Sequence, residues 1–181
     1  KPYRPRRWQP ALADAAACWL LSGELGISPV TAQVLYNRGF TTPEAAHRFL
    51  TMGREQILDP FLLKDMDKAV ELVRRRIASG RPIMIYGDYD VDGITGTAVL
   101  VLALKALGAE VAYYIPDRFS EGYGLNTGAL QAIRQQGYDF ILSVDTGVAA
   151  LAEAAAAREM GITLVVTDHH EPGPTLPEVD A

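Results

Sequence analysis

The sequence predicts an α/β domain with a mostly parallel sheet and helices on both faces, preceded by a small helical region. Four short apolar runs start at residues 83, 110, 139 and 162. Their starts are 27, 29 and 23 residues apart, about the size of a βα unit. The runs are IMIYG (83–87), EVAYYIP (110–116), DFILSVD (139–145) and ITLVVTD (162–168). The last two are continuous rather than alternating, which is typical of parallel strands covered on both faces.

Glycines mark where the helices between these strands should end. Gly108, Gly137 and Gly161 each come just before the next apolar run. Glycine is common directly after a helix because it adopts a left-handed backbone conformation at little cost. We therefore expect strands joined by helices in right-handed crossovers.

Residues 1–80 show a helical pattern and are expected to form a separate N-terminal region, with the α/β domain occupying residues 81–181. Apolar side chains recur at helical spacing at Leu62, Met66, Val70, Val73 and Ile77. The opposite face carries Glu71 and Arg75 at a favourable i,i+4 spacing. Two earlier stretches, PVTAQVLYNRG (29–39) and TTPEAAHRFL (41–50), are predicted to be short helices.

The charge of the chain points to a local acidic site. The formal net charge is −5, from 17 basic and 22 acidic residues. If the five aspartates at the predicted strand ends are set aside, 17 acidic residues balance the 17 basic ones, so any contact with nucleic acid must be local. The single cysteine, Cys18, excludes an internal disulfide and favours a cytoplasmic protein. The most apolar stretch, residues 94–108, is too short to span a membrane, so no membrane association is expected.

Acidic and imidazole side chains follow three of the four predicted strands. They are Asp88, Asp90 and Asp92 after the first, Asp145 at the end of the third, and Asp168, His169 and His170 at the end of the fourth. In an open parallel sheet, ligands bind beyond the carboxyl ends of the strands. If the first, third and fourth strands are neighbours, these side chains converge at one edge. Oxygen and imidazole ligands suit Mn²⁺, Mg²⁺ or Fe²⁺.

Simpler interpretations compete with a metal site. A single aspartate after a strand often caps the next helix, and Asp145 alone is consistent with that role. The D-x-D-x-D-G pattern from Asp88 resembles a calcium loop, but its twelfth residue is Val99 rather than a carboxylate, and a strand precedes it. Adjacent histidines are also found as ordinary surface residues. The coincidence of three strand ends favours the metal site.

Several of these motifs resemble those of a known family. GDYDVDG, SVDTG and VTDHH, in this order and spacing, are similar to the first three motifs of the DHH phosphoesterase superfamily, whose fold is Rossmann-like. PDRFSEGYGL (116–125), with VLYNRGF and DPFLLKDM upstream, resembles the RecJ-like single-stranded-DNA-specific exonucleases within it. The resemblance implies a two-metal phosphodiesterase that releases nucleotides from the 5′ end of single-stranded DNA in DNA recombination and repair. Many superfamily members have a histidine where this chain has Tyr86. The family also has a fourth acidic motif and C-terminal domains beyond Ala181, so we expect an N-terminal fragment.

The resemblance also implies metal-binding roles. Two Mn²⁺ or Mg²⁺ ions held roughly 3.5–4 Å apart would activate a water molecule and neutralise charge on the phosphoryl group. Asp145 is expected to bridge them and also to count as a catalytic residue. Asp88 and Asp90 would serve one ion, and Asp92 and His169 the other.

Further residues receive roles near the metals. Asp168 is expected to be a metal ligand or to orient one, and His170 to contact phosphate or donate a proton. Arg118 is predicted to bind DNA phosphate, with a surface ion pair to Glu121 as the simpler alternative. Tyr123 is expected either to stack on a base or to pack under its loop.

Two further features are predicted to contact the nucleic acid. They are the turn after the first strand and two basic clusters. Gly93 and Thr95 open the next helix, where backbone amides favour anions, although a tight strand-to-helix turn explains them equally well. The basic clusters are RPRRW (4–8) and the arginines at 74–76 and 81, which are either solvated surface or a track for DNA.

Two other functions are compatible with the motifs. One is a phosphatase or phosphodiesterase acting on pyrophosphate, a short oligonucleotide or a cyclic dinucleotide. The other is a non-catalytic nucleotide-binding module. The RFSEGYG motif and the N-terminal helices favour the exonuclease over a small-substrate phosphodiesterase. The complete set of aspartates at the strand ends favours it over a non-catalytic module.

Overall fold

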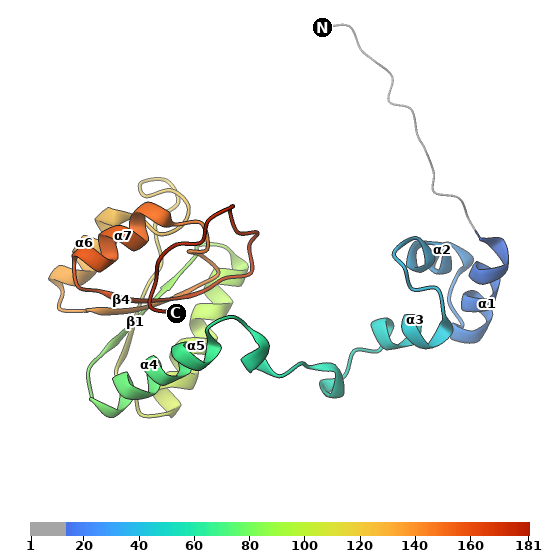
Figure 1. Ribbon diagram of the computed structural model, residues 1–181, viewed down its shortest axis with the longest axis horizontal. Coiled ribbons are helices and arrows are strands. Elements are labelled where there is room, and N and C mark those ends of the chain that lie inside the picture. Colours follow the sequence, from blue (N-terminus) through green and yellow to red (C-terminus); the bar gives the residue numbers. More distant parts are fainter. Residues whose placement is uncertain (1–13) are drawn as a thin grey trace, which may run out of the picture. The chain divides into compact units, whose positions relative to one another are not determined.

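Figure 1 shows the computed structural model, which describes residues 14–181. The basic run at residues 4–8 lies outside the described residues. By its contacts the chain divides into two units, Lys1–Asp59 and Pro60–Ala181.

The first unit contains three short helices around a small core. They are α1 (Ala15–Leu25), α2 (Pro29–Asn37) and α3 (Pro43–Leu50), followed by a 3-10 turn, η1 (Arg54–Gln56). Asp14, Ser28 and Thr42 each accept a hydrogen bond from a backbone amide in the first turn of the helix that follows. The core consists of Cys18, Leu21, Ala32, Leu35 and Ala46. Helices α2 and α3 agree with the sequence prediction, whereas α1 was not predicted.

The second unit is built on a four-stranded parallel sheet. Its elements are η2 (Pro60–Leu62), α4 (Met66–Ala78), β1 (Ile83–Gly87), α5 (Val91–Ala106), β2 (Val111–Tyr114), α6 (Thr127–Gln135), β3 (Phe140–Val144), α7 (Leu151–Glu159) and β4 (Thr163–Thr167). The strand order is β2-β1-β3-β4, so β1, β3 and β4 are neighbours. All three pairings are parallel. The predicted α/β fold with a parallel sheet is confirmed.

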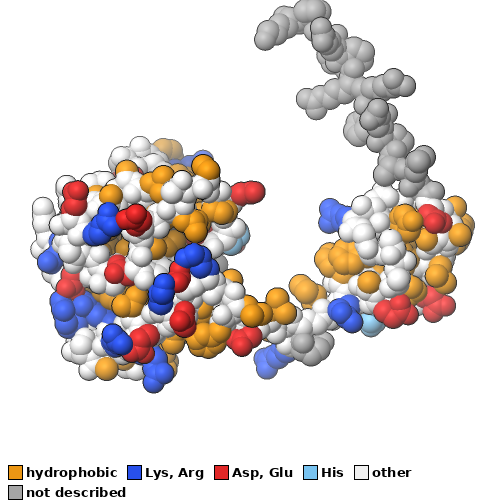
Figure 2. All heavy atoms as spheres, viewed as in Figure 1, with side chains coloured by type: hydrophobic (Ala, Val, Ile, Leu, Met, Phe, Trp, Pro, Cys, Tyr) orange, Lys and Arg blue, Asp and Glu red, His pale blue; other side chains and the backbone are white. Residues whose placement is uncertain are grey.

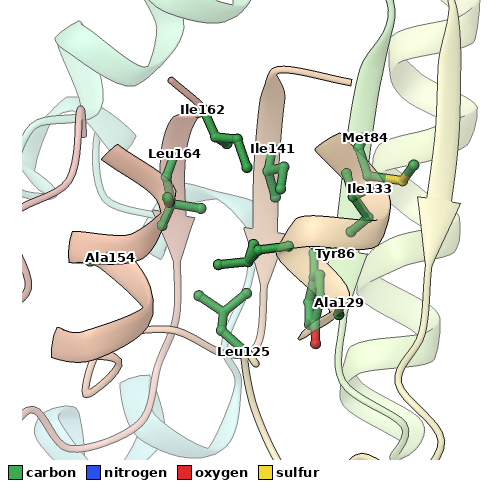
Figure 3. Close-up of a cluster of buried hydrophobic side chains, with 11 residues drawn as sticks. Met84, Tyr86, Leu125, Ala129, Ile133, Ile141, Ala154, Ile162 and Leu164 are labelled. Atoms are coloured by element: carbon green, nitrogen blue, oxygen red, sulfur yellow. The ribbon is translucent and has the colours of Figure 1, made fainter. Parts of the chain in front are cut away.

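Successive side chains of the strands point to opposite faces, which gives the sheet two cores. Met84 and Tyr86 of β1 pack on one face with side chains of α6 and α7. Figure 3 shows this cluster, with Ile133 of α6 and Ala154 of α7 facing the sheet. Ile83 of β1 points to the other face, which α4 and α5 cover. Figure 1 shows the two helical layers on either side of the strands.

Helix α4 belongs with the sheet rather than with the N-terminal helices. Leu72, Val73 and Ile77 of its apolar stripe pack against the core formed by Ile83 and its neighbours. The division by contacts therefore falls before α4, whereas the boundary predicted from the sequence falls at residue 80. The predicted stripe begins too early, since Leu62 is 74% exposed.

The charged side chains of the second unit form no continuous basic surface on the visible face. Figure 2 shows Lys and Arg interspersed with Asp and Glu there. Arg76 is buried, and its guanidinium pairs with Asp139, which Arg81 also contacts. Arg75 pairs with Glu71 at 2.6 Å, as its spacing predicted. Of these three arginines, Arg76 is therefore buried in the protein, whereas Arg75 and Arg81 remain largely exposed. No helix in the described part of the chain is long and apolar enough to cross a membrane.

Candidate metal centre

The carboxyl ends of β1, β3 and β4 bring the predicted acids together. Asp88 follows β1, Asp145 follows β3, and Asp168 follows β4. The backbone amide of Asp145 donates to the carbonyl of Thr167 at 2.9 Å, which ties the end of β3 to the end of β4. The sheet order therefore explains the convergence that the sequence pattern predicted.

Two of these aspartates are buried without the partners that a buried carboxylate normally has. Asp88 is 1% exposed and Asp145 is 6% exposed. None of their four side-chain oxygens accepts a hydrogen bond from the described residues. His169 Nε2 lies 2.8 Å from Asp145 Oδ1, a contact that becomes an ion pair when the imidazole is protonated. Asp88 has neither a hydrogen bond nor an ion pair with the described residues. A buried carboxylate without a partner is costly, so this site is suited to a bound cation.

Potential ligand atoms form two adjacent groups. Atoms of Asp88, Asp90 and Asp145 lie within 4.8 Å of one another, and so do atoms of Asp145, His169 and His170. Asp145 is common to both groups. This arrangement is the one that a bridging carboxylate between two ions requires.

The backbone of Asp145 is strained. Its φ angle is 63°, in the left-handed region that only glycine and, less often, asparagine or aspartate adopt readily. Burial is the largest effect that raises the pKa of Asp145, and the negative charge of Asp90 raises it further. Strain and an unfavourable charge environment at one residue are typical of functional sites. Asp145 does not cap α7, whose N-cap residue is Ala150.

Asp90 caps a helix and also belongs to a candidate ligand group. Its Oδ1 accepts hydrogen bonds from the amides of Asp92 at 2.9 Å and Gly93 at 3.1 Å, which caps α5. The pKa of Asp90 is lowered, and the hydrogen bond from the amide of Gly93 is the largest cause. The carboxylate therefore stays ionised, and it also belongs to the first ligand group.

Asp168 and Asp92 lie outside both ligand groups among the described residues. Asp168 Oδ2 accepts from the amide of Val148 at 2.9 Å, and Oδ1 lies 2.7 Å from His170 Nδ1. Although burial opposes it, these hydrogen bonds lower the pKa of Asp168. Asp168 thus holds His170 in this structure, and its predicted roles as a metal ligand or as the residue that orients one stay predictions. Asp92 is exposed in the first turn of α5 and lines a shallow hollow with Asp145 and His169.

His170 is held between two partners. Its Nδ1 faces Asp168, and its Nε2 lies 3.1 Å from the hydroxyl of Tyr123. Hydrogen bonding to Asp168 raises the pKa of His170. If Nδ1–H donates to Asp168, Nε2 accepts from Tyr123. Tyr123 therefore does more than pack under its loop.

Tyr86, which stands where many superfamily members have a histidine, is wholly buried. Its hydroxyl donates to the carbonyl of Gly124 at 3.0 Å and accepts from Asn126 at 3.2 Å. Tyr86 thus fixes the loop that carries Tyr123.

Arg118 makes a contact that the sequence did not predict. Its guanidinium lies 5.3 Å from the centre of the Tyr89 ring, in a cation–π contact. Glu121, the expected ion-pair partner, instead accepts from the hydroxyl of Tyr114 at 2.5 Å and from the amide of Asp117 at 2.8 Å. No ion pair to Arg118 is found among the described residues, so its charge remains available to a ligand.

Tyr89 is the residue that sequence reasoning missed. Its ring centre lies 6.2 Å from that of Tyr123, in an edge-to-face contact. Its position between two predicted metal ligands, Asp88 and Asp90, is the feature of the sequence that could have identified it. The Tyr89 side chain is half-buried beside these two aspartates.

Gly93 and Thr95 make local contacts within the strand-to-helix turn after β1. A Cβ atom on Gly93 would lie 2.4 Å from the carbonyl oxygen of Asp88. The hydroxyl of Thr95 donates to the carbonyl of Val91 at 2.7 Å. The tight-turn interpretation is thus supported, while contact of either residue with substrate stays a prediction.

Gly93→Ala should destabilise the protein by about 1–3 kcal/mol, because the added methyl group meets backbone that cannot move aside freely. Urea denaturation would measure the change, and Mn²⁺ titration should show weakened binding because Asp88 is displaced. The matched control is Gly128→Ala in α6, where the new Cβ lies at an ordinary 3.4 Å from Asn126 Oδ1. Equal stability of both variants would contradict the close-approach explanation.

Comparison with known proteins identifies the family. The model of the DHH family, N-terminal domain, matches residues 82–181, more than half of the chain. The chain belongs to the DHH family. The single-stranded-DNA-specific exonuclease RecJ of Bacillus subtilis is 45% identical over 175 residues, which make up 97% of this chain and 22% of that protein. The predicted resemblance is confirmed.

Solved structures agree with this assignment. Thermus thermophilus RecJ in complex with Mn²⁺ superposes with a TM-score of 0.66 and 33% identity, covering 93% of this chain and 23% of that one. RecJ in complex with Mg²⁺ from the same organism gives a TM-score of 0.54 and 30% identity, covering 88% of this chain and 19% of that one. The chain spans about a fifth of the length of these DHH-family relatives.

Proposed function

We propose that the protein containing this chain is a cytoplasmic, metal-dependent phosphodiesterase that releases nucleotides from the 5′ end of single-stranded DNA. The observation that carries the proposal is the pair of buried carboxylates, Asp88 and Asp145, whose oxygens accept no hydrogen bond from the described residues. The names of the RecJ relatives support the substrate. Their structures with Mn²⁺ and Mg²⁺ support the choice of ions.

The residues present fit two divalent ions. Asp88 and Asp90 would hold one, His169 with Asp92 the other, and Asp145 would bridge them. Bound in this way, the ions would supply a nucleophilic water and neutralise charge on the phosphodiester. Carboxylate and imidazole ligands suit Mn²⁺ and Mg²⁺.

The remaining side chains position the substrate and the proton donor. Asp168 holds the imidazole of His170 through the 2.7 Å contact with Nδ1. This leaves Nε2 as the ring nitrogen that faces away from Asp168, toward the hydroxyl of Tyr123. Arg118 offers a charged fork for a phosphate beside the metal ligands, since β2, which precedes it, is the neighbour of β1.

The substrate class is tested with the full-length gene product in Mn²⁺. Mononucleotides should appear from 5′-labelled single-stranded DNA and hardly at all from a blunt duplex, because only a single strand can reach a deep two-metal site. The Asp90→Ala variant should lose both metal binding and activity. Hydrolysis of pyrophosphate or a cyclic dinucleotide with single-stranded DNA spared would instead favour a small-substrate phosphodiesterase.

Arg118→Ala should leave Mn²⁺ affinity unchanged while reducing kcat/KM on single-stranded DNA roughly ten- to a hundredfold. A lost charge-assisted phosphate contact typically costs about 1.5–3 kcal/mol. If Arg118 binds the terminal phosphate, the defect should shrink on DNA that lacks a 5′ phosphate. An equal defect on both substrates would assign Arg118 to an internal phosphate, and the absence of any defect would contradict a substrate role.

A further inference from the structure

A cavity of about 400 Å³ lies beside the candidate metal centre. Residues from three loops line it, including Tyr123 and Leu125 after β2, Ala149 and Ala150 after β3, and His170 after β4. The first turn of α7 adds Glu153 to the wall. The volume falls in the usual range for small-ligand sites.

The cavity adjoins the site that would hold the metals. Asp168 lines both this cavity and the hollow that contains Asp92, Asp145 and His169. His170 also lines the cavity and shares a ligand group with Asp145. A phosphate at the metals would therefore have its attached nucleoside next to the cavity.

Hydrogen bonds fix one wall in place. Tyr123 contacts His170, His170 contacts Asp168, and Asp168 Oδ2 accepts from the amide of Val148. The loops after β2, β3 and β4 are thereby tied together. A ligand entering the cavity would meet a largely preformed surface, so little of its binding free energy would be spent on ordering the protein.

The lining favours a neutral planar ligand over an anion. Leu125 is buried and Ala150 is half-buried, which provides apolar surface, and Tyr123 provides an aromatic ring. No Lys or Arg lines the cavity, whereas Glu153 and Glu171 do. The half-buried carboxylate of Glu153 makes no hydrogen bond or ion pair with the described residues, and it would accept from a ring or exocyclic N–H. Every nucleobase carries such a donor.

We propose that this cavity is a subsite for the base of the nucleotide whose phosphate lies at the metal centre. The proposal rests on the proposed phosphodiesterase function and adds to it where the nucleoside binds. Since the acceptor on Glu153 fits the N–H groups of all four bases, the subsite would hold a base without selecting its identity.

The test compares two ligands that differ only in the base. Deoxycytidine 5′-monophosphate and 2-deoxyribose 5-phosphate are titrated in Mg²⁺, and the backbone amide resonances of Gly147, Ala149 and Ala150 are followed by NMR. The nucleotide should bind about ten- to a hundredfold more tightly, because stacking and burial of a base contribute on the order of 1–3 kcal/mol. Only the nucleotide should shift the resonances of these three residues.

Ala149→Trp fills the cavity, and Ala152→Trp, an exposed position on α7 outside it, is the matched control. The first variant should bind the nucleotide no better than the sugar phosphate while keeping its affinity for metal, and the control should behave as wild type. Equal binding of both ligands by the wild-type protein, with metal still bound, would overturn the base subsite alone. Failure to bind metal at all would overturn the proposed function together with it.

Discussion

Saturating Mn²⁺ should raise the melting temperature of the protein by roughly 10 °C. A ligand that binds only the folded state at a hundred times its Kd contributes about 2.7 kcal/mol, and 1 kcal/mol shifts the melting temperature of a unit of this size by about 3–5 °C. The site provides the reason, since Asp88 and Asp145 bury four oxygens that accept no hydrogen bond from the described residues. Calorimetry with and without the ion measures the shift.

Asp145→Ala should remove most of that rise, because Asp145 is the residue shared by both ligand groups. Asp117→Ala is the matched control, since this aspartate only caps its own turn through the amides of Phe119 and Ser120. The control should keep the full Mn²⁺ response. Identical melting of wild type and Asp145→Ala in both conditions would show that the metal centre is assigned to the wrong residues.

Asp139→Ala should destabilise the protein by about 3–5 kcal/mol, the usual cost of leaving one member of a buried ion pair alone. Asp139 Oδ1 lies 2.5 Å from Nη2 of Arg76, whose side chain is only 8% exposed. The arginine also donates to the carbonyl of Pro82, at 3.0 Å from Nε and 2.8 Å from Nη2, so the pair fastens α4 to the start of β1 and β3. Urea denaturation at neutral pH measures the loss.

Glu71→Ala provides the control for that experiment. It breaks the exposed pair with Arg75 on the same helix and should cost less than about 1 kcal/mol. If the two variants were equally stable, the buried pair would not be a significant anchor for α4.

The same pair predicts a pH dependence. Burial raises the pKa of Asp139, but the hydrogen bond and charge of Arg76 and the charge of Arg81 outweigh it, so the pKa is lowered. A carboxyl whose pKa is lower in the folded state contributes stability above its unfolded pKa of about 3.9 and loses it as the pH falls further. The free energy of unfolding of the wild type should therefore drop more steeply below about pH 4 than that of Asp139→Ala.

The fold and the general position of the site were predictable because both depend on local patterns. Apolar runs separated by helices indicated a parallel sheet, and acids at three strand ends indicated one edge of it. Helix α1 escaped prediction because its sequence is apolar all round and lacks the one-sided pattern of an amphipathic helix. Its capping residue, Asp14, was the remaining signal.

Contacts between distant residues could not be predicted in this way. Arg76 lies in a run of arginines that suggests a solvated face, and its burial depends on Asp139, 63 positions further along the chain. The contact of Tyr123 with His170 likewise joins two loops that no spacing rule connects. Such pairs arise from the sheet order and the loop conformations together.

The left-handed backbone at Asp145 has a consequence for how this sequence can change over evolutionary time. Glycine or asparagine would relax the φ of 63°, whereas a β-branched residue would not fit it. A descendant that no longer needed the ions would gain stability by drifting to glycine or asparagine at this position. Either residue here, in an otherwise intact relative, would thus indicate a lineage in which the proposed metal centre is no longer used and only the scaffold is retained.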